Sequence, residues 1–371
     1  MSSDVVLYIV VATALAFDFT NGFHDTANAI ATSISTRAMS PRFAVLMAAV
    51  LNFAGAFISL EVAATVAKGI VDAGAVTPTI VFGGLVGAIA WNLATWWFGL
   101  PSSSSHALIG GMVGSALVAQ GADAIQGDGI VEKVVLPALI APTLAFAVAG
   151  LAILVAYRVV GRQRPGVVNR GYRLGQIVTG SLFSLAHGTN DAQKTMGIIT
   201  LALIAHGDLS ANDFHVPAWV VICSASAIAL GTYSGGWRII RTMGSRIIKM
   251  DPAQGFSAQG AGSAVVLTAS HLGFPLSTTH VISGAVMGAG AAKRLSAVRW
   301  GVAGNIVLAW VLTLPCSAAI GGLAYAVSQV FGDEALGVVV VTLLVAGLIA
   351  AAFGSRIRRS PAVGGAAAAE A

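Results

Sequence analysis

Long apolar stretches follow one another along the whole 371-residue chain, and they restrict the possible fold more than any other feature. Residues 43–67, 77–99 and 301–330 each exceed the roughly 20 residues that a helix needs to cross a bilayer. Hydrophobic residues make up 56% of the chain and charged residues 9%, which is too little polar material to coat soluble domains. The sequence therefore predicts an all-α, polytopic membrane protein.

The basic residues lie between the apolar stretches, so membrane topology explains the net charge of +5 better than nucleic-acid binding does. The positive-inside rule predicts these basic loops in the cytoplasm: Arg37 with Arg42, 158–173, 238–249, 293–299 and 356–359. The acidic or nearly neutral connections are expected outside: Asp4, Lys68 with Asp72, 123–133, Asp208 with Asp213, and Asp333 with Glu334. We therefore expect a multi-pass protein of the cell membrane with its N-terminus outside and its C-terminus in the cytoplasm.

Threading the chain through these loops gives two repeats of inverted topology, each with a helix interrupted at a glycine and a helical hairpin. The repeats share a set of residues in the same order, Gly22, Asp25, Pro101 and His106 in the first and Gly188, Asp191, Pro275 and His280 in the second. The hairpins are expected over 77–120 and 256–292, either re-entrant or fully spanning.

These assignments divide the chain into five parts with about ten transmembrane segments. The parts are a first repeat at 1–157, an Arg-rich cytoplasmic linker at 158–173, a second repeat at 174–330, an additional transmembrane helix at 331–355, and a cytoplasmic tail at 356–371.

Each predicted interrupted helix carries an acidic residue inside an apolar stretch, Asp25 in the first and Asp191 in the second. An acid at the centre of a bilayer costs roughly 2.5–3.5 kcal/mol, so it is kept away from lipid and faces a partner or water. At a helix break, freed backbone groups together with Asp25, Thr26 and Asn28 can bind a cation or an anion. Helix capping by Asp25 and helix–helix contact through Asn28 are the structural alternative.

Lys194 follows Asp191 by three residues, so the two side chains lie on one helix face and can form an ion pair. A purely structural pair would stabilise little, which favours a role in ion coupling or in attracting an anion. Asp18 and Glu61 are each equally consistent with a proton site and with a buried, hydrogen-bonded acid.

The hairpin breaks, PSSSSH (101–106) and PLSTTH (275–280), each place a proline and several hydroxyl residues before an apolar helix. Hydroxyls and free backbone amides at such a helix start can surround a tetrahedral oxyanion, while ordinary N-capping is the alternative.

Four histidines lie next to these motifs, namely His24, His106, His187 and His280. Their spacing matches no metal-ligand motif, so we expect orienting hydrogen bonds from them and no protein-bound metal. Cys223 and Cys316 both lie in apolar stretches and support neither a disulfide framework nor a cysteine metal site. The sequence predicts no bound cofactor.

The segments NGFHDTANAIATSISTRAM (21–39) and SLAHGTNDAQKTMGIITLALIA (184–205), with PSSSSH and PLSTTH, resemble the PiT inorganic phosphate transporters, particularly the low-affinity bacterial type. The resemblance spans nearly the whole chain. It implies import of inorganic phosphate by symport with a cation, both bound between the repeats. The positions that match the family signature are Asp25, Asn28, Ser103, Ser104, Asn190, Asp191, Ser277 and Thr278.

With their neighbours Thr26, Gln193 and Thr279, these positions form the predicted substrate-binding set. The predicted ion-coupling set is Asp25, Asp191, Lys194 and Glu61.

One position departs from the sodium-coupled members, which resemble Asn-Asp-x-x-Asn in both halves. The second half here reads NDAQK, so Lys194 places an ammonium where a neutral ligand would sit. A fixed positive charge opposes sodium by Coulomb repulsion, whereas a nearby carboxylate can still exchange a proton, so we favour a proton over sodium as the coupling ion. The low-affinity type also implies that phosphate travels partly as a neutral complex with a divalent metal, although no ligand set in the sequence supports this.

Three other functions fit parts of the pattern. A sulfate permease of the same family is the nearest, because both oxyanions are tetrahedral. An intramembrane hydrolase with a serine from 102–105 is disfavoured because the Ser, His and Asp groups occur twice, whereas catalysis needs one asymmetric site. A passive channel would not accumulate its substrate. The sequence allows a homodimer and does not determine the oligomeric state.

Overall fold

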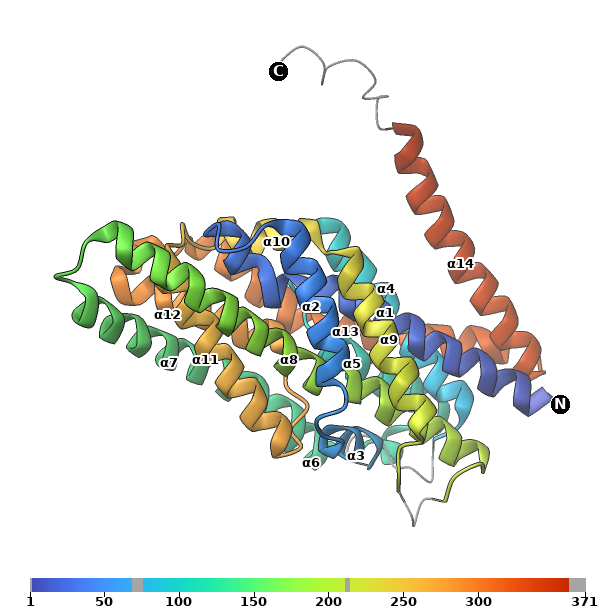
Figure 1. The fold of residues 1–371 in the computed structure, drawn as a ribbon. Coiled ribbons are helices and arrows are strands. Elements are labelled where there is room, and N and C mark those ends of the chain that lie inside the picture. Colours follow the sequence, from blue (N-terminus) through green and yellow to red (C-terminus); the bar gives the residue numbers. More distant parts are fainter. Residues whose placement is uncertain (1, 69–75, 211–213, 360–371) are drawn as a thin grey trace.

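The computed structural model describes residues 2–68, 76–210 and 214–359, and these residues form helices and connecting loops without a β-strand (Figure 1). The all-α fold class is therefore confirmed. The longer helices, in chain order, are α1 (Ser2–Ser35), α2 (Pro41–Gly55), α3 (Glu61–Lys68), α4 (Pro78–Phe98), α5 (Ser104–Gln120), α7 (Leu136–Val160), α8 (Pro165–His206), α9 (Ala218–Ser234), α11 (Pro252–His271), α12 (Thr278–Lys293), α13 (Trp300–Gln329) and α14 (Glu334–Arg359).

Short helical turns connect some of them: η1 (Ala122–Ala124), α6 (Gly127–Ile130), η2 (Val131–Val135), α10 (Trp237–Arg241), η3 (Thr242–Arg246) and η4 (Leu295–Ala297). The predicted linker 158–173 belongs mostly to the ends of α7 and α8, with residues 161–164 between them. The predicted tail begins inside α14, and its residues 360–371 lie outside the described part of the chain, as do Asp72 and Asp213.

Five helices in the described ranges are long and apolar enough to cross a membrane: Ser3–Ser35, Pro78–Phe98, Gly127–Val160, Trp300–Gln329 and Glu334–Ala352. The pair Ala218–Ser234 and Trp237–Arg246, bent by 58°, would form a sixth span. These helices fit a polytopic membrane protein, while the total of about ten segments stays a prediction.

The helices α1 and α8 are continuous, so the prediction that they are interrupted at Gly22 and Gly188 is wrong. Both glycines instead allow another helix to approach closely. A Cβ atom at Gly22 would lie 2.3 Å from the carbonyl oxygen of Ile228, and one at Gly188 would lie 2.1 Å from that of Asn52. Because neither approach leaves room for a side chain, these glycines mark helix crossings.

The two predicted hairpins are present as α4–α5 and α11–α12. Gly99 ends α4 in the left-handed conformation with φ of 66°, and the Ser103 side chain caps the start of α5. In the second hairpin, Asp251 and Gln254 form a capping box at the start of α11, and Ser277 caps α12. The breaks lie at the prolines, as the sequence predicts.

Helix packing follows the same scheme in both halves of the chain. The helix α1 packs on α9, and the corresponding helix α8 packs on α2. Likewise α5 packs on α13, and α12 packs on α7. Each half thus contributes helices that pack on the other, and α1 crosses α8 between them. The opposite orientation of the halves in a membrane stays a prediction.

Two hydrophobic clusters pack against different parts of α1 and α8 along the length of these helices. The first cluster contains Phe17 of α1 and Met196 of α8, and the second contains Ala27 and Ala186 of the same helices. The buried polar residues of α1 lie mainly between Phe17 and Ala27, and those of α8 lie mainly between Ala186 and Met196. The packing therefore holds the polar site inside the protein.

Candidate functional site

The carboxylates of Asp25 and Asp191 lie close together where α1 packs on α8. Asp25 and Asp191 are both buried, and His187, one turn before Asp191, lies with its Nε2 atom 3.1 Å from Asp191 Oδ2. One ligand atom each from Asp25, His187 and Asp191 lie within 4.8 Å of one another. The structure thus brings the two predicted acidic residues into one site.

The start of α12 is hydrogen-bonded to both carboxylates. Thr278 donates to Asp191 Oδ2 and Thr279 donates to Asp25 Oδ1, each at 3.3 Å. Asn28 on α1 donates from its amide to the same two hydroxyls, at 3.3 Å to Thr278 and 2.8 Å to Thr279. One helix start therefore connects residues of both halves.

Lys194 is buried and points its ammonium into the site. It donates to Asp191 Oδ1, to Ser105 Oγ at 2.5 Å and to the carbonyl oxygen of Leu276 at 2.7 Å. Ser105 belongs to the first hairpin and Leu276 to the second, and the Ser105 hydroxyl itself donates to Leu276 O at 3.2 Å. The ammonium is thus held by a carboxylate, a hydroxyl and a carbonyl, all oxygen groups that also bind a metal cation.

Each carboxylate has a histidine partner. His24 Nδ1 lies 2.7 Å from Asp25 Oδ1, and its Nε2 lies 3.1 Å from the Thr95 hydroxyl. His187 Nδ1 lies 3.1 Å from Asn52 Oδ1. His24 thus orients Asp25 through a hydrogen bond, whereas His187 Nε2 lies close to Asp191 without the geometry of a hydrogen bond.

The two remaining histidines contact aromatic rings. The ring centroids of His106 and His280 are 4.7 Å apart in an edge-on arrangement, and His280 stacks on Trp310 at 4.0 Å. Their backbone amides donate to the capping serines Ser103 and Ser277. These contacts join the starts of α5 and α12 across the two hairpins.

Several buried polar atoms at this site have no hydrogen-bond partner within the described chain: Asn28 Oδ1, Ser104 Oγ and Asn190 Oδ1. Buried polar groups are nearly always satisfied, so atoms left open in a polar site indicate the place of a ligand. Ser104 is also the first residue of α5, where backbone amides and the helix dipole favour an anion. The Ser104 hydroxyl can therefore donate to an anion, whereas Asn28 Oδ1 and Asn190 Oδ1 only accept and suit a cation or a protonated ligand oxygen.

Four predicted residues have structural roles. Thr26 donates to Gly22 O at 2.5 Å and Thr232 O at 3.2 Å, so it joins α1 to α9. Gln193 accepts from the amides of Val62 and Ala63 and so caps α3. Ser103 and Ser277 are N-caps, the role that the alternative interpretation gave them.

Glu61 does not lie in a long apolar helix, and the structure does not bring it to the site. The chain leaves helical conformation after α2 and resumes it at Glu61, whose side chain is exposed in the first turn of α3. Acidic residues favour that position because of the helix dipole. Asp18, by contrast, is fully buried on α1 and lies in the electrostatic field of Asp191 and Lys194.

The structure adds residues to the site that the sequence did not indicate. Ser105 and Leu276 hold Lys194, Ser270 accepts from Asn190 at 2.8 Å, and Asn52 and Thr95 hold the two histidines. Only Ser105 carried a signal, as one of four consecutive serines.

Buried acids, an ammonium and helix starts enclosed by apolar helices define a polytopic membrane transporter with a central polar site. The chain belongs to the Phosphate transporter family, whose profile matches residues 21–170 and again residues 161–321. The resemblance to inorganic phosphate transporters is thus confirmed.

Individual relatives agree with this membership. The chain is 50% identical over 356 residues to a probable low-affinity inorganic phosphate transporter of Mycobacterium bovis, covering 96% of this chain and 85% of that protein. It is 52% identical over 317 residues to a protein of the same description from Rhizobium meliloti, covering 85% of this chain and 94% of the relative.

A solved structure described as the sodium-dependent phosphate transporter is also similar. It has a TM-score of 0.79 and 26% sequence identity, and the match covers 88% of this chain and 99% of that one. Together these relatives confirm that the chain is a multi-pass membrane transporter and not an enzyme.

Proposed function

We propose that this chain imports inorganic phosphate by symport with protons, through the central site formed by α1, α8 and the starts of α5 and α12. The observation that supports proton coupling is the position of Lys194, whose ammonium is bound by Asp191, Ser105 and Leu276. A fixed ammonium in this oxygen-lined position repels sodium by Coulomb interaction.

Phosphate binding is supported by the donors that remain open. The hydroxyl of Ser104 and the first backbone amides of α5 and α12 are suited to the oxygens of a tetrahedral anion. A phosphate hydroxyl can in turn donate to the Asp25 carboxyl, whose second oxygen still accepts a hydrogen bond when the acid is protonated, and an ionised sulfate has no hydroxyl to donate.

The carboxylate next to the substrate provides the coupling. While Asp25 is charged, it repels an anionic phosphate, and a proton on this carboxylate removes the repulsion. Proton and phosphate therefore increase each other's affinity, as reciprocal linkage requires. Asp18 is a second buried carboxylate on the same helix that can carry the proton.

Uptake of labelled phosphate into proteoliposomes tests this proposal with imposed gradients of either ion. We expect uptake to follow an inward proton gradient without sodium, and Asp25→Asn or Asp191→Asn to slow it by at least about tenfold. Asp128→Asn, the same change at an exposed residue, is the matched control. Uptake that follows a sodium gradient and ignores a proton gradient would disprove proton coupling, and wild-type rates in both site variants would disprove the site assignment.

A divalent metal can accompany phosphate as cargo. Asp25, His187 and Asp191 offer three ligand atoms within 4.8 Å of one another, and the negative charge of a phosphate arriving with the metal offsets the repulsion that Lys194 exerts on a bare cation. In proteoliposomes, uptake of phosphate should then rise when Mg²⁺ or Zn²⁺ is supplied, with matching uptake of the labelled metal. Phosphate uptake that is unchanged by a chelator would rule out this cargo.

Sulfate is the second candidate substrate because its tetrahedral oxygens fit the same donors. Unlabelled sulfate in excess should leave labelled phosphate uptake unchanged if the Asp25 carboxylate selects a protonated oxyanion. Equal competition by sulfate and phosphate would favour a sulfate permease.

A further inference from the structure

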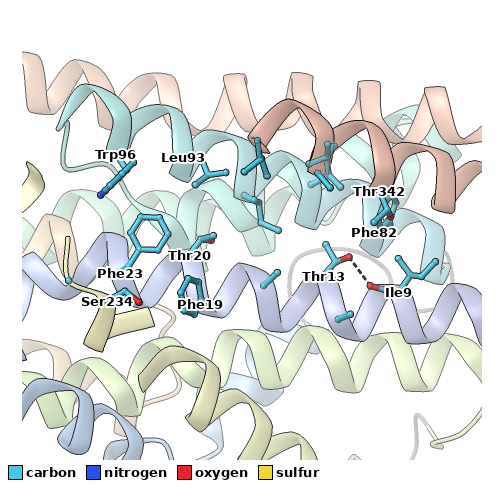
Figure 2. A pocket seen from close by; sticks show the side chains of 18 residues that line it. Ile9, Thr13, Phe19, Thr20, Phe23, Phe82, Leu93, Trp96, Ser234 and Thr342 are labelled. Carbon is cyan, nitrogen blue, oxygen red and sulfur yellow. Dashed lines mark hydrogen bonds between the residues drawn. The ribbon is translucent and has the colours of Figure 1, made fainter. Parts of the chain in front are cut away.

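An apolar groove lies along α1, and its lining does not include Asp25, Asn28, Asp191 or Lys194. It has a volume of about 760 Å³ and is bounded by α1, α4, α9 and α14 (Figure 2). Phe23 and Trp96 lie at one end, and Ile9 and Thr342 lie at the other. Ile9 and Phe23 are fourteen residues apart on α1, which corresponds to a groove about 21 Å long at about 1.5 Å per residue.

A second cavity of about 350 Å³ adjoins the Trp96 end of this groove. It is lined by Arg238, Arg241 and Arg246 together with Trp97, Phe98, Gly99 and Trp237. The two cavities are adjacent along two segments of the chain. In the first segment Trp96 lines the groove and Trp97 lines the arginine cavity, and in the second Gly235 lines the groove and Trp237 lines the arginine cavity.

Arg238 connects the two cavities. Its guanidinium carbon lies 5.2 Å from the ring centroid of Trp96 and 5.3 Å from that of Trp97, and it donates to the carbonyl oxygen of Trp97. Arg238 is thus fixed, whereas Arg241 and Arg246 are exposed. None of the ion pairs within residues 2–68, 76–210 and 214–359 involves these three arginines. Their positive charge is therefore available to an anion.

We propose that these two cavities bind one anionic phospholipid, with an acyl chain in the groove and the headgroup phosphate on Arg241 and Arg246. The groove is almost entirely apolar and its length exceeds the about 15 Å of one leaflet's hydrocarbon layer, half of the about 30 Å bilayer core. Arginine forms paired hydrogen bonds with phosphate, and tryptophan is enriched at the membrane interface. Basic pockets between helices bind anionic headgroups in this way.

The chemistry of the joined cavities favours this occupant over two others. Free phosphate could bind the arginines but would leave the adjoining apolar groove of about 760 Å³ unfilled. A second copy of the chain would place its own apolar surface in the groove and would leave the arginines without a counter-charge. A phospholipid fills the apolar groove with an acyl chain and provides the arginines with the negative charge of its phosphate.

Retention of lipid by the purified, full-length protein tests this proposal. Protein in nanodiscs that contain phosphatidylglycerol and phosphatidylcholine with identical acyl chains is released into detergent, and bound lipid is counted by native mass spectrometry. We expect one phosphatidylglycerol to be retained preferentially. Arg241→Ala with Arg246→Ala should weaken this retention about thirtyfold, the product of about fivefold for each arginine.

Matched variants separate the two parts of the site. Arg170→Ala with Arg173→Ala removes the same charge from another basic cavity, whose lining shares no residue with the apolar groove, and should retain the lipid. Ala16→Trp fills the groove and should release the lipid, whereas Ala147→Trp on the exposed face of α7 should not. Arg238 is left intact because it supports Trp97.

Three results would overturn the proposal. The first is equal retention of phosphatidylglycerol and phosphatidylcholine. The second is unchanged retention in both the double arginine variant and Ala16→Trp. The third is displacement of bound lipid by millimolar inorganic phosphate together with a raised phosphate KM in the double arginine variant, which would assign the arginines to free phosphate.

Discussion

At the scale of single residues, Lys194 makes the two halves of the site different. In the first half Asn28 follows the motif carboxylate by three residues, whereas in the second half Lys194 does. The structure shows that this ammonium is not a surface charge, because its three acceptors come from α8 and from both hairpins. Any change of Lys194 therefore acts on the joined hairpin tips as well as on Asp191.

Stability measurements should show strong coupling between Lys194 and Asp191. Lys194→Gln or Asp191→Asn alone leaves a buried charge without its partner and should destabilise the protein by about 3–5 kcal/mol. The double variant removes both charges and should lose less than the sum of the single losses. Thermal unfolding of the detergent-solubilised variants measures these differences. Additive losses would mean that the pair does not interact in the native protein.

Ser104 should matter for substrate and little for stability. Its hydroxyl is buried without a partner, so Ser104→Ala removes no hydrogen bond from the protein itself. We expect the phosphate KM to rise by about tenfold to a hundredfold, which corresponds to one lost charge-assisted hydrogen bond of about 1.5–3 kcal/mol, while the melting temperature stays unchanged. Ser296→Ala, at an exposed position in η4, is the control for transport kinetics. An unchanged KM with a lowered melting temperature would show that Ser104 is structural.

At the scale of elements, close helix crossings hold the site together. The crossing of α1 and α9 places Gly22 at Ile228 and Gly231 at Phe19, and the crossing of α8 and α2 repeats this arrangement with Gly188 and Gly55. Both crossings lie next to the motif carboxylates. They keep α1 and α8 close enough for one helix start, that of α12, to reach Asp25 and Asp191.

A side chain at such a crossing should force the helices apart. Gly188→Ala would place a Cβ atom 2.1 Å from Asn52 O and should destabilise the protein by about 1–3 kcal/mol or more. The control is Gly171→Ala on the same helix, which has no atom within 4 Å of the new Cβ and should be neutral or stabilising by up to about 1 kcal/mol. Melting temperatures of the two variants provide the comparison. If Gly188→Ala were as stable as Gly171→Ala, the glycine would serve the flexibility of α8 instead.

At the scale of the whole molecule, the corresponding helices of the two halves pack in the same way, each on a helix of the other half. The profile of the family also matches the chain twice, once over each half. A duplicated architecture of this kind supports the proposed binding site between the halves, where the hairpin starts meet Asp25 and Asp191. Opening such a site to one side requires the halves to move against each other.

Cysteine labelling on intact cells should reveal the orientation of the halves. Arg37 in the α1–α2 loop and Asp208 in the α8–α9 loop are at corresponding places in the two halves, and the charge pattern predicts them on opposite sides. In a chain with Cys223→Ala and Cys316→Ala, a membrane-impermeant maleimide should label Asp208→Cys and leave Arg37→Cys unlabelled. Labelling of both positions would contradict inverted repeats.

Much of this architecture could be predicted from local patterns in the sequence. The apolar stretches required a helical membrane protein, because the bilayer interior leaves backbone groups no other means of forming hydrogen bonds except a closed barrel. The prolines and serines of 101–106 and 275–280 marked the hairpin breaks, because proline and N-capping hydroxyls define a helix start within a few residues. The acids Asp25 and Asp191 indicated the candidate site, because a charge inside a bilayer is costly and is kept away from lipid, and the structure places the two together.

Tertiary structure decided what local patterns leave open. A glycine weakens a helix whether it marks a break or a crossing, so only the carbonyl oxygens of Ile228 and Asn52 show that Gly22 and Gly188 are crossings. Glu61 belonged to an apolar stretch in sequence, yet the chain turns before it and leaves it exposed. Lys194 meets Ser105 and Leu276, residues more than 80 positions away, because the hairpins converge on α8. Such contacts depend on which helices pack together, and the residues nearby in sequence carry no signal for that choice.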